Sequence, residues 1–292
     1  MRDLGTLGDA DSKAFGINNA GQVVGESTPV GDSYTRAFIT GPNGAGMRAL
    51  DNEVDSSYIS SAYGINDAGQ AVGLFGSPRV PGAFITGPNG VGMRYLGSLG
   101  GPTSYASSIN NAGQVVGRAD ASGGGRHAFI TGPNGVGIRD LGTLGAAVSE
   151  ASGINNAGQV VGDLFFPDRQ YSYHAFITGP NGADMKDLGT LGGTDSHSYG
   201  INDAGQAVGE SESGAFITGP NGAGMMDLNS LVNVPNGGSL RAATGINNAG
   251  QIIALGFIPA VPEPEISALF IAGLALVGFM ARRKKRTAPT LV

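Results

Sequence analysis

Three short strings recur along the chain at a nearly fixed period, and such a period means that one structural unit is built many times over. The string INNAGQVVG begins at Ile17 and recurs, identically or nearly so, at Ile65, Ile109, Ile154, Ile201 and Ile246, with spacings of 48, 44, 45, 47 and 45 residues. AFITGPNG begins at Ala37, Ala83, Ala128, Ala175 and Ala215, and a string close to MRDLGTLG begins at Met1, Met47, Met93, Ile138, Met185 and Met225. Six modules of about 45 residues therefore fill residues 1–258.

Each module reads as four short strands, namely MRDLG, the segment that ends in GIN, QVVG and AFIT. They are rich in Val, Ile, Phe and Leu and are bounded by turn residues, and none is long enough for a helix. In the Gly-Pro-Asn-Gly turn, Pro fixes φ at the first central position and Asn tolerates the next. Four strands in such a period are typical of a propeller blade. The sequence predicts an all-β fold, a β-propeller of about six four-stranded modules, with a five- or seven-bladed ring or an open β-solenoid as alternatives.

The composition supports this class of fold and excludes others. Gly accounts for 52 of the 292 residues and charged residues for 14%, so a helical bundle or coiled coil is excluded. Most of the Gly recurs at fixed module positions, in the NAG, GPNG and LGTLG turns, which indicates ordered hairpins. The net charge of -6 argues against nucleic acid as a partner, and the absence of Cys excludes a disulfide framework, a zinc ribbon and a thiol nucleophile.

The first module begins in its middle. Met1 stands 16 residues before Ile17, the same distance that separates Met93 from Ile109. The chain also has six copies of the first three strands but only five of AFIT. We therefore expect that the module starts upstream of Met1, and that the upstream part holds an edge strand and a signal peptide. The alternative is a natural start at Met1.

The last 34 residues differ from the repeats in composition and charge. Residues 1–260 carry a net charge of -9 and residues 261–292 one of +3. A Pro-rich linker, 259–265, is followed by the uncharged and mostly apolar run 266–281, which predicts a short transmembrane helix. The linker holds the motif Pro262, Glu263 and Pro264, and the run ends at the basic residues Arg282, Arg283, Lys284, Lys285 and Arg286. A buried core helix is the alternative, and five consecutive basic residues argue against it.

Basic residues stay cytoplasmic, so 282–292 is predicted to be a cytoplasmic tail, with the helix in the inner membrane and the repeats outside. Residues 261–286 resemble the PEP-CTERM sorting signal of Gram-negative bacteria, in which Pro-Glu-Pro precedes a transmembrane segment and an Arg-rich cluster. The resemblance implies export, recognition by an exosortase, cleavage near Pro262-Glu263-Pro264, and delivery to the cell surface or extracellular matrix. Glu265 replaces the usual Ser or Thr after the motif.

The modules in residues 1–258 resemble the HAF family of extracellular repeats, named for His-Ala-Phe. Only His127 and His174 keep the His, and the other modules have Arg36, Gly82 or Gly214 at this position. The His is therefore dispensable to the module, and the resemblance transfers no catalytic residue.

The sequence contains no motif that predicts chemistry. The three His residues, His127, His174 and His197, show no metal-ligand spacing, and there is no D-x-D-x-D-G loop, phosphate loop or G-x-S-x-G elbow. Asp67 and Asp203 alternate with Asn in a hairpin turn, which turn chemistry explains. We expect a protein that is not an enzyme, with no catalytic residue, no metal and no cofactor.

Positions that are repeated in every module serve the scaffold, so function is expected where modules differ. The longest connector between QVVG and AFIT, residues 163–174, contains Phe165, Phe166, Arg169, Tyr171 and Tyr173. Aromatic rings with a guanidinium suit stacking on a sugar ring or a protein contact. The alternative is a longer, well-packed hairpin with no ligand.

Three functional hypotheses follow. The first is a non-enzymatic, exported repeat protein with a structural or adhesive role at the cell surface or in the biofilm matrix, with exosortase and exopolysaccharide as partners. The second is a glycan-binding or glycan-processing propeller that uses the loops around residues 163–174. The third is a cytoplasmic propeller with a tail anchor.

Overall fold

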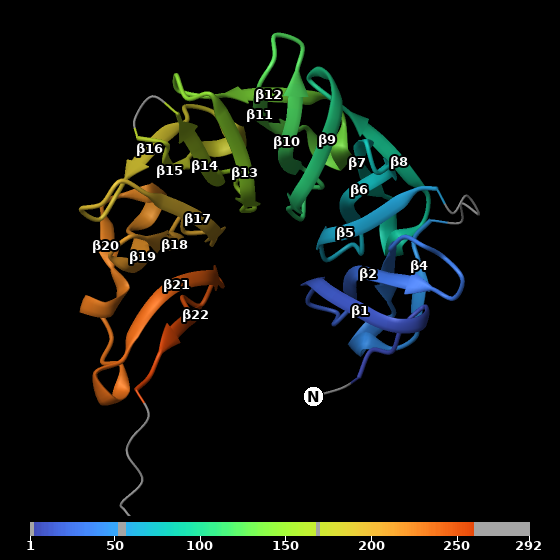
Figure 1. Cartoon of the computed structure of the whole chain (residues 1–292), viewed down its shortest axis with the longest axis horizontal. Coiled ribbons are helices and arrows are strands. Elements are labelled where there is room, and N and C mark those ends of the chain that lie inside the picture. Colours follow the sequence, from blue (N-terminus) through green and yellow to red (C-terminus); the bar gives the residue numbers. More distant parts are fainter. Residues whose placement is uncertain (1–2, 52–56, 168–169, 260–292) are drawn as a thin grey trace, which may run out of the picture.

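The computed structural model describes residues 3–51, 57–167 and 170–259, and their secondary structure consists of β-strands and one-turn 3-10 helices. Within these ranges the strands form five four-stranded antiparallel sheets and one two-stranded sheet, here called sheets 1 to 6 in chain order. This confirms the predicted all-β class. Figure 1 shows the sheets side by side along an arc, with β1 at one end and β22 at the other.

Sheet 1 contains β1 (Gly8–Ile17), β2 (Val23–Pro29), β3 (Arg36–Thr40) and β4 (Met47–Ala49), and sheet 2 contains β5 (Ile59–Ile65), β6 (Ala71–Ser77), β7 (Val80–Thr86) and β8 (Met93–Gly97). Sheet 3 contains β9 (Gly100–Ile109), β10 (Val115–Ala121), β11 (Arg126–Thr131) and β12 (Ile138–Gly142), and sheet 4 contains β13 (Val148–Ile154), β14 (Val160–Phe166), β15 (Ser172–Ile177) and β16 (Lys186–Gly189). Sheet 5 contains β17 (Ser196–Ile201), β18 (Ala207–Ser211), β19 (Gly214–Thr218) and β20 (Met225–Asp227), and sheet 6 contains β21 (Ser239–Ile246) and β22 (Ile252–Phe257). The 3-10 helices are η1 (Pro42–Gly44), η2 (Pro88–Gly90), η3 (Pro133–Gly135), η4 (Pro180–Gly182), η5 (Pro220–Gly222), η6 (Leu228–Ser230) and η7 (Pro235–Gly237).

The sheets are offset from the sequence modules by one strand. Four short strands per module were predicted correctly, but the MRDLG string was expected to open a module and instead forms the last strand of the preceding sheet. In sheet 3, for example, Phe129 of the AFIT strand pairs with Asp140 of the following MRDLG-type strand. The physical reason is the contact between turns, because the Gly-Pro-Asn-Gly turn hydrogen-bonds to the NAG turn of its own sheet and so keeps the MRDLG-type strand in that sheet. The LGTLG segment then leads the chain to the next sheet.

The two recurring turns contact each other within each four-stranded sheet. The Asn of η1, Asn43, has a φ of 55°, and its counterparts in η2 to η5 have φ between 52° and 54°, as the predicted turn requires. Asn43 N–H donates to Ala20 O at 3.0 Å, and Gly44 N–H donates to Gly21 O at 2.8 Å. The NAG and GPNG strings therefore recur together because each satisfies the backbone of the other.

Neighbouring sheets meet across one repeated interface. The Phe of every AFIT strand is completely buried, and these residues are Phe38, Phe84, Phe129, Phe176 and Phe216. Near the arc's inner side, Asn66 Nδ2 donates to Asn110 O of the next sheet at 3.1 Å, and Asn110 Nδ2 donates to Asn155 O at 3.0 Å. This Asn ladder runs from Asn18 to Asn247 and joins all six sheets.

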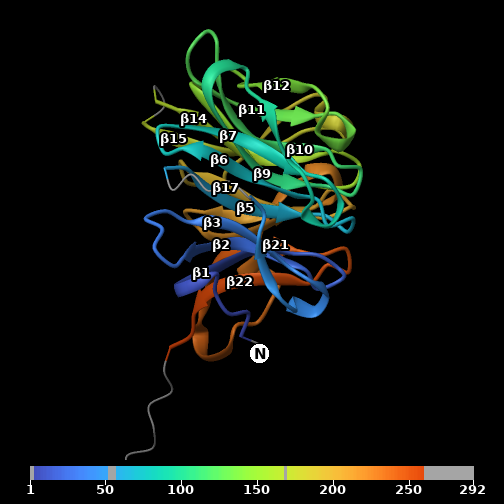
Figure 2. The ribbon, with the colours of Figure 1, turned by 90° about the vertical axis from the view of Figure 1, so that its right-hand side faces the viewer.

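The two ends of the arc are not joined in the described part of the chain, and the arc encloses an incomplete ring (Figures 1 and 2). At the first end, residues 3–7 lie on sheet 1 as the last strand of a preceding sheet would. Ser12 Oγ donates to Gly5 O at 2.9 Å, as Ser104 Oγ donates to Gly97 O at 2.7 Å between sheets 2 and 3. A propeller-like arc of six sheets is therefore what the repeats form.

No helix in the described ranges is long and apolar enough to cross a membrane. The predicted transmembrane helix 266–281 and the basic tail 282–292 lie outside the described residues. The same is true of Pro262, Glu263 and Pro264 of the sorting motif.

Candidate ligand-binding face

The β14–β15 hairpin, which the sequence singled out, presents a row of aromatic side chains. Phe165 and Tyr173 are cross-strand partners, and their ring centroids lie 4.8 Å apart. Tyr171, at the tip of the hairpin, is 73% exposed and lies 6.3 Å from the Phe165 ring. Three aromatic residues of the predicted loop therefore lie next to one another on this hairpin.

Two other residues of the predicted loop do not belong to this row. Phe166 is 3% exposed and packs in the core between sheets 3 and 4, with its ring edge-on to His174 at 5.3 Å. The reason is strand alternation, because Phe165 and Phe166 point to opposite faces of the sheet. Arg169 lies outside the described residues.

The row continues onto the neighbouring sheet, which the sequence did not predict. The Tyr173 ring lies 5.0 Å from the ring of His197 on β17, and His197 stacks on Tyr199 at 6.5 Å with an interplanar angle of 5°. We call Phe165, Tyr171, Tyr173, His197 and Tyr199 the aromatic ridge. His197 and Tyr199 belong to the following module and lie on β17. The only sequence signal that could have pointed to them is that both occupy positions that vary between modules.

Carboxylates hold the polar atoms of the ridge in place. Asp163 Oδ2 pairs with His197 Nδ1 at 3.0 Å and raises the pKa of that imidazole, while Asp163 Oδ1 accepts from Ser198 N–H at 3.0 Å. Burial, followed by the hydrogen bond to Glu210, raises the pKa of the Tyr199 phenol. The phenol therefore remains a hydrogen-bond donor at neutral pH, and the ridge presents stacked rings with fixed polar edges.

A shallow hollow of about 190 Å³ adjoins the ridge between sheets 3 and 4. Phe165 and Tyr173 form one wall, and Glu150 and Asp163, which are cross-strand partners, lie beside it. Glu150 also accepts hydrogen bonds from Arg118 at 2.8 Å and forms an ion pair with Arg126 at 3.2 Å. The volume is below the range of roughly 300–1,000 Å³ that is usual for small-molecule sites.

The remaining two histidines form pairs within their own sheets. His127 Nδ1 lies 2.7 Å from Asp140 Oδ2, and His174 Nδ1 lies 2.8 Å from Asp187 Oδ2. Within the described ranges no group of three or more His, Cys, Asp or Glu side chains could hold a metal ion. Asp67 and Asp203, interpreted as turn residues, accept hydrogen bonds from the Asn side chains of both neighbouring sheets.

Comparison with protein families matches the PEP-CTERM protein-sorting motif to residues 260–285. This confirms the sorting signal that the sequence indicated. Signals of this kind direct export and sorting and are recognised by an exosortase. No curated protein matches the sequence.

Three solved structures resemble the chain in fold at low sequence identity. One comes from a study of two prolyl endopeptidases, with a TM-score of 0.56, 10% identity, and coverage of 86% of this chain and 36% of that one. A putative TolB from Agrobacterium tumefaciens has a TM-score of 0.44 and 12% identity, and the match covers 59% of this chain and 63% of that one. TolB from Acinetobacter baumannii has a TM-score of 0.49 and 9% identity, with coverage of 73% of this chain and 52% of that one. This chain thus spans less than two thirds of each of these proteins. The first likeness supports a propeller-like arrangement of sheets and concerns the fold alone.

Proposed function

We propose that the chain is a non-enzymatic adhesive protein of the cell surface or matrix, and that it contacts extracellular glycan through the aromatic ridge. Its export and sorting follow from the PEP-CTERM motif. Anchoring in the inner membrane through 266–281, cleavage near Pro262-Glu263-Pro264 and release into the matrix complete the proposed route. The HAF resemblance, which rests on the repeated sequence strings, is part of the proposal.

One observation carries the proposed glycan contact. The residues common to all modules are used in turns, ladders and core, whereas the ridge combines residues that vary between modules. Tyr171 and Tyr173 are 73% and 39% exposed, so ring faces and edges are accessible. Stacked aromatic rings beside hydrogen-bonding carboxylates provide both contacts that a sugar ring needs, since its C–H faces are apolar and its hydroxyls polar.

Glycan processing is a second candidate, because Glu150 and Asp163 are opposite each other on β13 and β14, next to the ridge. A pair of carboxylates is the usual catalytic equipment of a glycosidase. Here both are engaged, Glu150 with Arg118 and Arg126, and Asp163 with His197. This favours binding without hydrolysis.

The test is affinity electrophoresis and a glycan array with the protein and its Tyr171→Ala/Tyr173→Ala variant. We expect retardation by at least one acidic or neutral exopolysaccharide, and a loss of about tenfold or more in affinity in the double variant, since each stacking ring contributes roughly 1 kcal/mol. Tyr34→Ala is the matched control, because Tyr34 is an exposed tyrosine in the corresponding hairpin of sheet 1. Unchanged binding in the double variant would refute the proposal that the aromatic ridge binds the glycan. Release of shortened glycan would refute the non-enzymatic role.

A further inference from the structure

Asn is followed by Gly six times in the chain, and Pro precedes it each time. Five of these Pro-Asn-Gly copies belong to the AFITGPNG strings of sheets 1 to 5. The sixth, Pro235-Asn236-Gly237, forms η7 in the connection from sheet 5 to β21. All six Asn residues adopt the same left-handed turn, with φ between 52° and 58°. Because the local sequence and backbone are matched, any difference between the six copies comes from their surroundings.

In sheets 1 to 5 the nitrogen that follows the Asn is bound to the neighbouring NAG turn. Gly44 N–H donates to Gly21 O at 2.8 Å, and the equivalent glycines make the same bond at 2.8 to 3.0 Å. These equivalents are Gly90, Gly135, Gly182 and Gly222, and all five glycines are buried. The backbone nitrogen after each of these Asn residues is therefore hydrogen-bonded and shielded from water.

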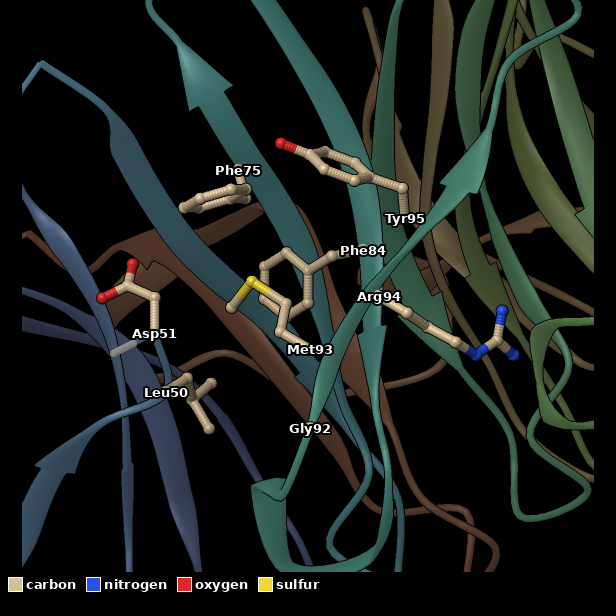
Figure 3. A pocket seen from close by; sticks show the side chains of 8 residues that line it. All are labelled: Leu50, Asp51, Phe75, Phe84, Gly92, Met93, Arg94 and Tyr95. Carbon is tan, nitrogen blue, oxygen red and sulfur yellow. The ribbon is translucent and has the colours of Figure 1, made fainter. Parts of the chain in front are cut away.

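Contacts from the preceding sheet hold some of the same turns further. The Arg94 guanidinium donates to Asn134 O of sheet 3. Figure 3 shows Arg94 extending from β8 away from Phe84. Gln114 Nε2 of sheet 3 donates to Asn181 Oδ1 of sheet 4 at 3.2 Å. Opening such a turn therefore breaks several hydrogen bonds at once.

The η7 turn makes none of these contacts with the described residues. Within that part of the chain, neither the N–H of Gly237 nor the side-chain amide of Asn236 has a hydrogen-bond partner. Both residues are exposed, and a Cβ on Gly237 would meet no described atom within 4 Å. Gly238 N–H donates to Pro235 O at 3.1 Å, which closes the turn only locally. The backbone nitrogen of Gly237 can therefore approach the Asn236 side chain at little cost.

We propose that Asn236 is a site of spontaneous deamidation, at which the backbone nitrogen of Gly237 attacks the side-chain amide carbon. The new C–N bond closes a five-membered succinimide. The side-chain nitrogen leaves as ammonia, with the proton that the backbone nitrogen gives up. Water then opens the ring at either carbonyl and leaves aspartate or isoaspartate. Asn is a thermolabile residue, and Gly favours the attack because it has no Cβ beside the nitrogen.

The modification changes the charge and the backbone at the entrance to sheet 6. One carboxylate replaces one neutral amide, so the net charge of the chain goes from -6 to -7. In the isoaspartate product the main chain runs through the side-chain carbon of residue 236, shortly before β21 begins at Ser239. The modified chain therefore separates from the unmodified one by anion exchange.

The test is to incubate the full, folded chain at mildly alkaline pH, which favours loss of the backbone proton. Digestion with trypsin and chymotrypsin followed by mass spectrometry then measures amide and acid at each site. Asn221 and Asn236 fall into different peptides, because Leu228 and Leu231 lie between them. We expect Asn236 to react at least about tenfold faster than any of the other five, since these require local opening of a bonded turn. Both aspartate and isoaspartate should form.

The same chain unfolded in urea is the control for sequence. Without the contacts between turns, the six Asn-Gly sites should react at similar rates. If Asn236 kept its full advantage in urea, the flanking residues and not the fold would explain it, and the proposal would be overturned. Equal rates at all six sites of the folded chain would overturn it as well.

Two glycine variants test the chemistry. Gly237→Ala places a Cβ beside the attacking nitrogen and should slow the conversion of Asn236 about fivefold or more. Gly224→Ala is the matched control, because Gly224 also has positive φ and open space around it but follows Ala223. It should leave the rate at Asn236 unchanged.

An Asn236 rate that Gly237→Ala does not change, or a product that contains aspartate alone, would contradict attack by the backbone nitrogen. If Gly237→Ala fails to fold, the comparison of the six sites in the unchanged protein decides alone, because it needs no variant.

Discussion

The interior interfaces of the arc and its two end faces are built from equivalent residues in different surroundings. Val24, Val72, Val116, Val161 and Val208 are each 0% exposed, whereas Ile253, at the same module position in sheet 6, is 70% exposed. At the other end Ile17 is 69% exposed, while Ile109 and Ile154 are buried. The comparison shows that a module does not bury its own apolar residues, because burial comes from the next sheet.

The comparison also shows how each sheet matches its own neighbour. One variable position on a central strand contacts one variable position on the next inner strand. Glu26 accepts from Ser61 at 2.6 Å, Glu150 accepts from Arg118 at 2.8 Å, and Asp163 pairs with His197 at 3.0 Å. The equivalent residue in sheet 6 is Leu255, which is 61% exposed. We infer that these pairs, which differ between interfaces, favour one order of sheets over a shifted one.

The largest expected difference between interior and end concerns Phe residues. Phe129 is fully buried between sheets 2 and 3, so Phe129→Ala should lower the free energy of unfolding by about 3–5 kcal/mol through lost contacts and a cavity. Phe257 on β22 is 57% exposed, so Phe257→Ala should cost less than about 0.5 kcal/mol. Urea unfolding followed by far-UV circular dichroism measures both. Similar losses in the two variants would contradict the distinction between interior and end.

The sequence predicted the repeated parts of this architecture well because they depend on local chemistry. The positive φ of Asn43 and the strand before it depend on neighbouring residues in the sequence, and the five copies of this strand and turn strengthened the prediction. The sequence did not predict that the MRDLG-type strand joins the preceding sheet. Whether the chain stays in one sheet after a turn or crosses to the next depends on how the sheets pack. No local pattern distinguishes these paths.

The candidate site was predicted only where it lies on one hairpin. Tyr171, Phe165 and Tyr173 share the β14–β15 hairpin, and simple strand alternation would have separated Phe165 from Phe166. His197 and Tyr199 join them through contact between sheets 4 and 5, about 25 residues further along the chain.

The second prediction compares two Asn residues that make the same bonds within their loops. Asn110 Oδ1 accepts from Gln114 N–H at 3.0 Å, and Asn247 Oδ1 accepts from Gln251 N–H at 2.9 Å. Only Asn110 is buried, and its Nδ2 also donates to Asn155 of the next sheet. Asn110→Ala should therefore cost about 2–3 kcal/mol and Asn247→Ala about 1 kcal/mol.

Thermal or urea unfolding of the two Asn variants provides the measurement, with the unchanged protein under the same conditions. An equal cost would mean that the ladder bond between sheets contributes nothing beyond the loop. A larger cost for Asn247→Ala would contradict the whole comparison, since it would place more stability at the end of the arc than in its interior.

The smallest expected effect is the pH dependence of one interior interface, where Asp163 of sheet 4 meets His197 of sheet 5. The hydrogen bond to Asp163 raises the pKa of His197 above 6.5 in the folded protein. Its stabilising contribution is therefore fully present below pH 6.5, the unfolded value, and is lost as pH rises through the folded pKa. Because the pair is partly exposed, the contribution should be below about 1 kcal/mol.

His197→Gln should remove this dependence, so the difference in unfolding midpoint between the unchanged protein and the variant should shrink from pH 5.5 to pH 8. His127→Gln is the control, since His127 pairs with Asp140 inside sheet 3 and joins no two sheets. If the same change in midpoint with pH appeared in the His127 variant, the effect would belong to His–Asp pairs in general. If it appeared only at His197, contact between sheets would be the source, as the contrast between interior and end requires.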